Sequence, residues 1–349
     1  LVGSEMCIRD SVYGEDMSVI IALALRELGA TRRTERDAGS WTLTGETLDS
    51  GDDWQDFDVV HKVTGVHGRA RIVTTRRGAP AQARAAARRR IQREYELIRS
   101  LRQESIVPPL DLATDDDGNA VLVYEKLDDF APLDLALLTR TLTAEQQLEV
   151  LTQVAEALAY AHRNQVSNRG LSPSTVLINT SCLDDSGAIQ IRLADWSWAG
   201  RIHATTSASP TLAGSQIAGT TSDDDVYQAP EDRWSPTADR MAVDLFSLGA
   251  LAYFVLSGEP PARDRTDLRT RLRAQNGLDL AAVDGRFVDE RLRSLVLHAT
   301  RPSVSERVDL DAKTQQPRFG AAEFRSALQE YKSDSGPDPE VRTDPLNLS

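Results

Sequence analysis

The chain has 349 residues, a formal net charge of -13 at pH 7, and an apolar fraction of 40%. This length suits one large two-lobed domain or two ordinary domains, and the apolar fraction is normal for a protein with a real core. The negative charge argues against a general polyanion-binding surface, although an acidic chain can still carry a local basic patch.

The cysteines and the apolar runs exclude further classes. Cys7 and Cys182 make no metal-ligand spacing, so neither a disulfide framework nor a zinc site is indicated, and a reducing cytoplasm fits best. The longest apolar run, Val19 to Leu25, is far shorter than the roughly 20 residues that cross a bilayer. We therefore expect a cytoplasmic protein without a membrane segment.

Both ends of the chain differ from the rest. The opening LVGSEMCIRDS resembles a translated sequencing adapter, so residues 1–11 are left out of the expected fold. Residues 1–40 are predicted to be a lead-in segment, with a helix from Ser18 to Leu28. Residues 333–349 are rich in Pro, Asp and Ser and are predicted to be a truncated linker. We expect a fragment at both ends.

From Trp41 the pattern becomes that of strands. WTLTGETLDSGDDWQDFDVVHKV and GRARIVTT are followed by the Ala- and Arg-rich helix APAQARAAARRRIQREYELIRSLRQ, then by the alternating segments PPLDLA and AVLVYEKL. These segments predict a small lobe over residues 41–127, with a five-stranded antiparallel sheet and one helix.

Residues 128–332 are predicted to form a larger, mainly helical lobe. A capping residue, Thr143, precedes a helix whose apolar face carries Leu148, Leu151, Val154 and Leu158. Farther on, DRMAVDLFSLGALAYFVLSGEPP is apolar on nearly every side, which is typical of a helix buried all round. The two lobes together give an α+β fold class.

Three short segments stand in a fixed order in the larger lobe. The loop NRGLSPSTVLI follows the long helix, the turn LADWS follows a short strand, and YQAPE closes a Ser- and Thr-rich stretch from Trp198 to Gln228. This order resembles the catalytic loop H-R-D-L-x-x-x-N, the D-F-G turn and the A-P-E segment of protein kinases. The resemblance covers roughly Trp41 to Tyr331 and implies the two-lobed protein-kinase-like fold.

The resemblance implies roles for several residues. Asp244 would hold the backbone of the loop at Arg169, and Arg307 would pair with Glu231, as buried charges require. Asp195 stands where the family has its magnesium ligand.

The catalytic letters differ from the family pattern. Gly170 stands in place of the base Asp, Thr175 in place of the second magnesium ligand Asn, and Ser172 in place of a Lys that touches the transferring phosphate. Gly170 has no side chain that accepts a proton, and a Thr hydroxyl is a weaker metal ligand than a carboxamide.

The nucleotide-binding positions are degenerate as well. Gly51 remains from the glycine-rich loop, with carboxylates of Asp52, Asp53 and Asp56 that would repel phosphates. An ordinary acidic hairpin turn explains the same residues.

Farther along, Val73 or Thr74 falls where the phosphate-binding Lys is expected, and Glu94 is predicted to be a solvated or Arg-paired carboxylate. Glu125 and Leu127 belong to the hinge beside adenine. We expect ATP and Mg²⁺ to bind weakly or not at all.

The Arg-rich helix is a candidate partner surface. Arg84, Arg88 and Arg89 lie along one side at helical spacing, and Arg forks suit phosphate groups. A phosphorylated loop of an adjacent kinase domain is the predicted ligand, and DNA is the runner-up. A solvated helix face explains the same arginines.

A narrower resemblance rests on the G-LSP-S-VLI loop, the DWS turn and the W-QDFD-V-H segment. These look like the kinase-like part of the phage growth limitation kinase W family and related NERD-domain serine/threonine kinases of BREX-type phage-defence loci. Three functions compete: a pseudokinase that regulates or binds a neighbouring kinase domain or defence protein, an active atypical serine/threonine kinase, and a nucleic-acid-sensing module that uses the Arg-rich helix.

Overall fold

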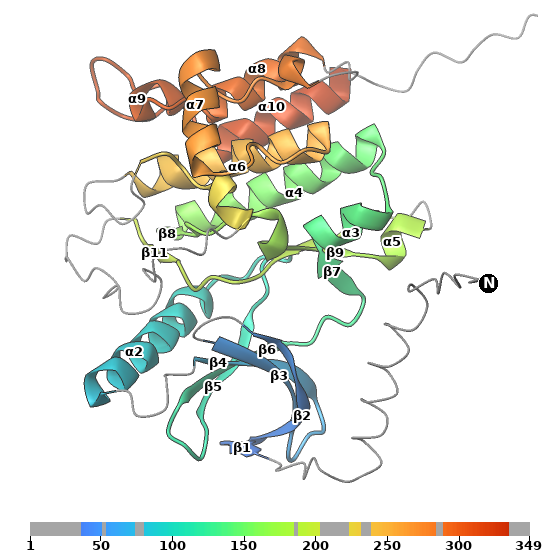
Figure 1. Ribbon diagram of the computed structural model, residues 1–349, viewed down its shortest axis with the longest axis vertical. Coiled ribbons are helices and arrows are strands. Elements are labelled where there is room, and N and C mark those ends of the chain that lie inside the picture. The colour runs from blue at the N-terminus through green and yellow to red at the C-terminus, as the bar shows by residue number, and fades with distance from the viewer. Residues whose placement is uncertain are drawn as a thin grey trace, which may run out of the picture.

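The chain builds a lobe around a curled sheet and a second lobe from helices (Figure 1). The computed structural model describes residues 36–50, 54–73, 80–184, 188–202, 223–231, 239–283 and 289–334. The helix expected at 18–28, Gly51, most of the Ser- and Thr-rich stretch and most of the C-terminal linker lie outside these residues.

The small lobe contains an antiparallel sheet in the order β1-β2-β3-β4-β6-β5. Its strands are β1 (Arg36–Ala38), β2 (Trp41–Ser50), β3 (Trp54–His61), β4 (His67–Val73), β5 (Pro109–Thr114) and β6 (Ala120–Glu125). The sheet curls back on itself because Ala38 forms a bridge with Asp115, just beyond β5.

The predicted boundary of this lobe was too late. The sheet begins at Arg36 rather than at Trp41 and has six strands rather than five. The polar segment before Trp41 is held because Ala38 is fully buried and the Nη2 atom of Arg36 pairs with Asp115 Oδ2 at 3.0 Å.

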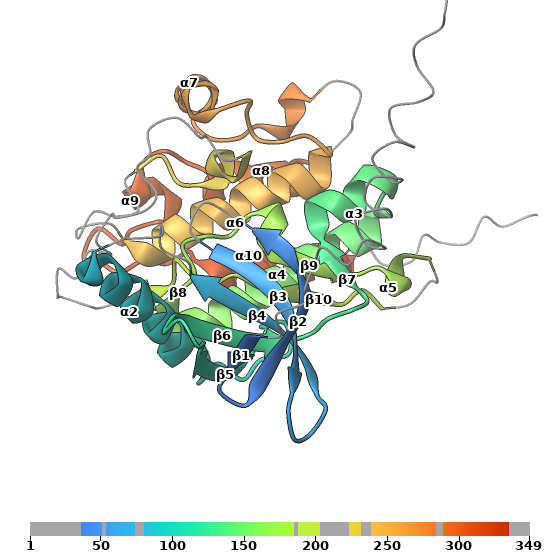
Figure 2. The same cartoon turned by 60° about the horizontal axis from the view of Figure 1, so that its bottom comes forward.

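The sheet has two faces of different chemistry. Ala70 and Ile72 of β4 pack inside the curl with apolar residues of β3 and β6. Arg69 and Arg71 alternate with them, so they project from the opposite face. Helix α2 (Ala81–Ile98) runs beside β4, β5 and β6 (Figure 2).

Helices dominate the large lobe, as predicted. They are α3 (Leu133–Thr139), α4 (Ala144–Arg163), α5 (Ser181–Asp184), α6 (Arg240–Ser257), α7 (Arg265–Gln275), α8 (Glu290–Ala299), α9 (Val304–Arg307) and α10 (Ala321–Asp334). One hydrophobic core continues from Val73 and Ile91 of the small lobe to Leu151 and Phe246 of the large lobe.

Short strands and 3₁₀ turns complete the large lobe. Strands β7 (Phe130–Pro132), β9 (Val176–Asn179) and β10 (Ile191–Leu193) form one small sheet, and β8 (Val166–Ser167) pairs with β11 (Gly200–Arg201). The turns are η1 (Pro173–Thr175), η2 (Asp223–Tyr227) and η3 (Leu280–Ala282).

Two helix predictions are confirmed. At the start of α4, the hydroxyl of Thr143 accepts from Gln146 N, and the Gln146 side chain accepts from Thr143 N, which forms a capping box. Helix α6 is buried on nearly all sides, begins at the N-cap Asp239, and ends at Gly258, whose φ of 75° is a left-handed conformation.

Helix α6 is long and apolar enough to cross a membrane by length and composition alone. However, 83% of the relevant window is buried inside the protein. This burial is typical of a core helix.

Asp244 connects α6 to the loop that follows β8. Its carboxylate is fully buried and accepts from the backbone N–H groups of Asn168 at 2.8 Å and Arg169 at 2.6 Å. The same carboxylate lies 2.8 Å from Nε2 of His162 on α4. Asp244 therefore fixes the loop to both central helices.

We predict that Asp244→Ala destabilises the fold by about 3 kcal/mol or more, because buried donors lose their acceptor. Urea unfolding of the full chain measures the effect, and Asp128→Ala, at a side chain that is 73% exposed, is the matched control. An Asp244→Ala variant that unfolds like the wild type would contradict this role.

Candidate functional site

The loop from Asn168 to Thr175 follows β8, ends with the η1 turn, and keeps a defined shape. Arg169 has a φ of 65°, which is unusual for a residue with a side chain and is stabilised by the hydrogen bond from its N–H to Asp244. The N–H of Gly170 donates to Asn168 Oδ1 at 3.0 Å. The loop geometry is therefore maintained by a contact with α6 and by a hydrogen bond within the loop.

Gly170 has a packed surface where a side chain would begin. A Cβ atom added to Gly170 would lie 2.8 Å from Cδ1 of Trp198, closer than non-bonded carbons approach. The guanidinium of Arg90, on α2, lies 5.5 Å from the centre of the Trp198 ring. The indole of Trp198 thus fills the space of a side chain at Gly170.

Thr175 and Ser172 are occupied by local hydrogen bonds. The hydroxyl of Thr175 donates to Ser172 O and accepts from Ser172 N, each at 3.0 Å. The fully buried Ser172 places its Oγ 2.9 Å from Ser174 Oγ. These contacts close the η1 turn.

Asp224 joins the same loop and was missed by the sequence reasoning. Ser174 Oγ donates to Asp224 Oδ2 at 2.9 Å. Burial raises the pKa of Asp224, and the hydrogen bonds from Ser174 and Ser172 oppose that rise. The acidic run just before YQAPE was the available signal, but a loop contact across 50 positions is not visible in the sequence.

Asp195 follows β10 and is paired with a cation from the small lobe. Its Oδ2 lies 2.8 Å from Nη1 of Arg71, and its Oδ1 accepts from Ser197 N at 3.2 Å. Burial alone would raise the pKa of Asp195, but the charge of Arg71 and the bonds from Ser197 outweigh it and lower the pKa to about 2.

Strand β4 presents Arg71 to Asp195, two residues before the Val73 considered from the sequence, and Thr74 lies outside the described residues. Arg71, rather than Val73, presents a cation to Asp195, while Val73 is 5% exposed and packs in the core. Arg71 also donates from Nε to Asp56 Oδ1 at 2.9 Å and lies 4.4 Å from the centre of the Trp54 ring. Burial opposes its charge, yet Asp195 and Asp56 raise the pKa of Arg71 well above its usual value.

Glu94 is buried, contrary to the prediction of a solvated or Arg-paired carboxylate. Only 2% of the residue is exposed, and its Oε1 accepts from the hydroxyl of Tyr124 at 2.5 Å. Burial, reinforced by Asp195, raises the pKa of Glu94 to about 7, although Arg71, Tyr124 and Arg90 act in the other direction. Glu94 is therefore partly protonated near neutral pH.

The hinge residues have separate surroundings. Glu125 ends β6 and is exposed, and Leu127 packs partly against the core. Between them, Nζ of Lys126 pairs with Asp58 Oδ1 at 3.1 Å.

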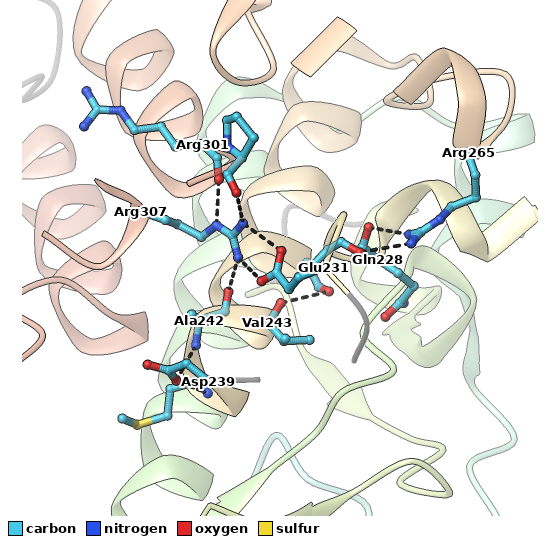
Figure 3. A network of polar contacts seen from close by, with 12 residues as sticks. Gln228, Glu231, Asp239, Ala242, Val243, Arg265, Arg301 and Arg307 are labelled. Carbon is cyan, nitrogen blue, oxygen red and sulfur yellow. Dashed lines mark hydrogen bonds and ion pairs between the residues drawn. The ribbon is translucent and has the colours of Figure 1, made fainter. Parts of the chain in front are cut away.

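The closing segment is fixed by arginines (Figure 3). The fully buried Arg307 binds both carboxylate oxygens of Glu231, at 2.6 and 3.1 Å, and donates to Ala242 O at 2.9 Å. Arg265 of α7 donates to Gln228 O at 2.8 Å and to Ala229 O at 3.1 Å. The structure thus brings together the pair predicted to be structural.

The arginines of α2 have different environments. Arg84, Arg88 and Arg89 are exposed, but Arg88 donates from Nη2 to Gly118 O at 2.6 Å, in the turn between β5 and β6. One member of the predicted partner surface is therefore engaged with the small lobe itself.

The residues at the positions of the family's base and magnesium ligands are engaged within the protein or carry no ligand. Asp195 is neutralised by Arg71, Thr175 closes its own turn, and Gly170 offers no carboxylate. In the described ranges, no group of three or more His, Cys, Asp or Glu side chains is arranged to hold a metal ion.

We predict that ionisation of Glu94 lowers the free energy of unfolding as the pH rises. Its pKa in the folded chain, about 7, exceeds the ordinary value of 4.5, so its contribution is complete below pH 4.5 and is lost as the pH rises through 7. Between pH 5 and pH 8, the free energy of unfolding in urea should fall by about 2 to 3 kcal/mol more for the wild type than for Glu94→Gln. Glu96→Gln, exposed on the same helix, is the control and should keep the wild-type slope; equal slopes for Glu94→Gln and wild type would contradict the burial of this proton.

Comparison with known proteins agrees with this geometry. A family model for the protein kinase domain matches residues 58–317. The chain is similar to the probable kinase PglW of Streptomyces coelicolor, with 24% identity over 82% of this chain and 20% of that protein. It is also similar to the human serine/threonine-protein kinase ULK1, with 26% identity over 66% of this chain and 21% of ULK1.

Another relative and one solved structure extend the likeness. The serine/threonine-protein kinase PknB of Mycobacterium leprae is 26% identical over 49% of this chain and 26% of PknB. The crystal structure of Rad53 1-466 in complex with AMP-PNP superposes with a TM-score of 0.59 and 17% identity, over 82% of this chain and 64% of the Rad53 chain.

The chain spans about a fifth to a quarter of the length of these curated relatives. The predicted two-lobed α+β fold and the resemblance to the phage growth limitation kinase are confirmed. Because the family model covers well over half of the sequence, the chain belongs to the protein kinase domain family.

Proposed function

We propose that this chain is a catalytically degenerate kinase domain, a pseudokinase, that serves as a regulatory or binding module. The observation that carries the proposal is the contact between Gly170 and Trp198, because an indole occupies the space that a catalytic carboxylate needs. Loss of a general base alone costs on the order of 10² to 10⁴ in rate. Position 170 therefore has neither a carboxylate nor the room for one.

The metal position supports the same proposal. Asp195 is the remaining candidate ligand from the family pattern, and its carboxylate already forms an ion pair with Arg71 at 2.8 Å. A magnesium ion would compete with that guanidinium for the carboxylate. Phosphoryl transfer depends on metal ions that neutralise the developing charge, so this pairing opposes catalysis as well as binding.

The proposed setting is a larger cytoplasmic phage-defence kinase of BREX type. The support is the likeness to PglW, of which the matching region is only 20%. Within such a protein, we propose that the module binds an adjacent kinase domain or another defence protein. Arg84 and Arg89 are exposed on α2 and suit a phosphorylated partner segment, with DNA as the alternative ligand.

A second candidate is an active atypical serine/threonine kinase, and Asp224 favours it. This carboxylate reaches the loop through Ser174 and belongs to the segment that ends in YQAPE. Its pKa is raised by burial, which is the direction expected of a general base. The ion pair between Asp195 and Arg71 makes this candidate the weaker one.

We predict no phosphotransfer by the purified full chain. Radiolabel from ATP should enter neither the chain nor a generic serine/threonine substrate above the level of Asp195→Ala, because Gly170 and Thr175 stand in place of the base and of one metal ligand. Incorporation that disappears in Asp195→Ala would overturn the pseudokinase proposal. If it also disappears in Asp224→Asn, the active-kinase candidate with Asp224 as its base takes its place.

A further inference from the structure

Asp56 places a buried carboxylate on the face of the small-lobe sheet that carries Arg69 and Arg71. It lies on β3, is 1% exposed, and stands directly across from Arg71 on β4. Its neighbours on the same face include the aromatic ring of Trp54, which covers the Arg71 guanidinium. The carboxylate therefore lies in the interior of the site. An acidic hairpin turn, which also explained this residue from the sequence, would have left it at the surface.

Two arginines hold this carboxylate as they would hold a phosphate. Arg71 donates from Nε to Oδ1 at 2.9 Å and from Nη2 to Oδ2 at 3.1 Å, which is a bidentate contact. Arg69 donates from Nε to Oδ2 at 2.9 Å. Arginine forks bind carboxylates and phosphates with the same geometry, so the two anions compete for one position.

The charges of the cluster already balance. Asp56 and Asp195 carry two negative charges, and Arg69 and Arg71 carry two positive charges, so no net positive charge faces an incoming phosphate. A phosphate chain would have to displace Asp56 and leave that carboxylate buried without its partners. Desolvation of an unpaired carboxylate is costly, so the exchange is unfavourable.

We propose that Asp56 is an internal anion that occupies a polyphosphate-binding position formed by Arg69 and Arg71. The proposal rests on the proposed function, since it gives a reason for the weak ATP binding that is expected of a pseudokinase. It also goes further, because replacing Asp56 by a neutral residue would make Arg69 and Arg71 available to a polyphosphate.

The test is ATP binding by the full chain. Binding is measured as the rise in melting temperature at millimolar ATP and by calorimetric titration. Asp56→Asn should bind ATP at least about tenfold more tightly than the wild type, because one like charge near the phosphates is removed. Adenosine, which lacks phosphates, should gain nothing. Asp58→Asn is the matched control, since Asp58 lies on the same strand and face but pairs with Lys126.

A second variant guards against misfolding. Asp56→Asn/Arg69→Gln removes one charge of each sign, keeps the net charge, and leaves Arg71 available to phosphates. It should also bind ATP more tightly than the wild type. Adding Arg71→Ala to either variant should abolish the gain.

Several results would overturn the proposal. These are folded Asp56 variants with wild-type affinity, an equal gain in Asp58→Asn, a gain for adenosine equal to that for ATP, or a gain that survives Arg71→Ala. Radiolabel transfer is measured separately on the same variants. Transfer by the wild type would refute the pseudokinase proposal, whereas the ATP affinities decide the role of Asp56.

Discussion

The buried carboxylate of Asp244 is the interaction on which the shape of the site depends. It accepts from two successive N–H groups of the loop while it contacts His162 on the neighbouring helix. These bonds keep Arg169 in its left-handed conformation, and they do so without any catalytic residue. The loop can therefore keep the geometry of a kinase although its base position holds Gly170. The shape of the loop is thus held by a residue of α6 and does not depend on a carboxylate at position 170.

Internal contacts of the protein occupy the surroundings of Gly170 and Asp195. Trp198 fills the space beside Gly170, and Arg71 pairs with Asp56 in its own sheet and with Asp195 of the large lobe. The pair between Arg71 and Asp195 joins the small-lobe sheet to the turn after β10. A preformed contact of this kind suits a module that presents a surface to a partner, because binding then requires less ordering.

Much of this architecture is predictable from the sequence because its signals are local. The order of the loop, turn and YQAPE segments indicated the two-lobed fold, and the periodicity of α4 and α6 indicated their burial. The site was less predictable because its contacts depend on strand register and on distant partners. Arg71 rather than Val73 faces Asp195. The buried carboxylate of Glu94 accepts a hydrogen bond from Tyr124, which is 30 positions away in the sequence. Strand β1 was missed because Arg36 and Asp37 are polar and owe their place to pairing with β2.

The central claim is that Trp198 and Gly170 form one packed unit that excludes a side chain at the base position. A double-mutant cycle tests it most directly, by urea unfolding of Gly170→Ala, Trp198→Ala and the double variant. The account predicts that Gly170→Ala costs about 1 to 3 kcal/mol in the wild type and much less when Trp198 is absent. Gly320→Ala, where an added Cβ meets only ordinary contact at 3.5 Å, should cost little. Additive effects at positions 170 and 198 would contradict the account.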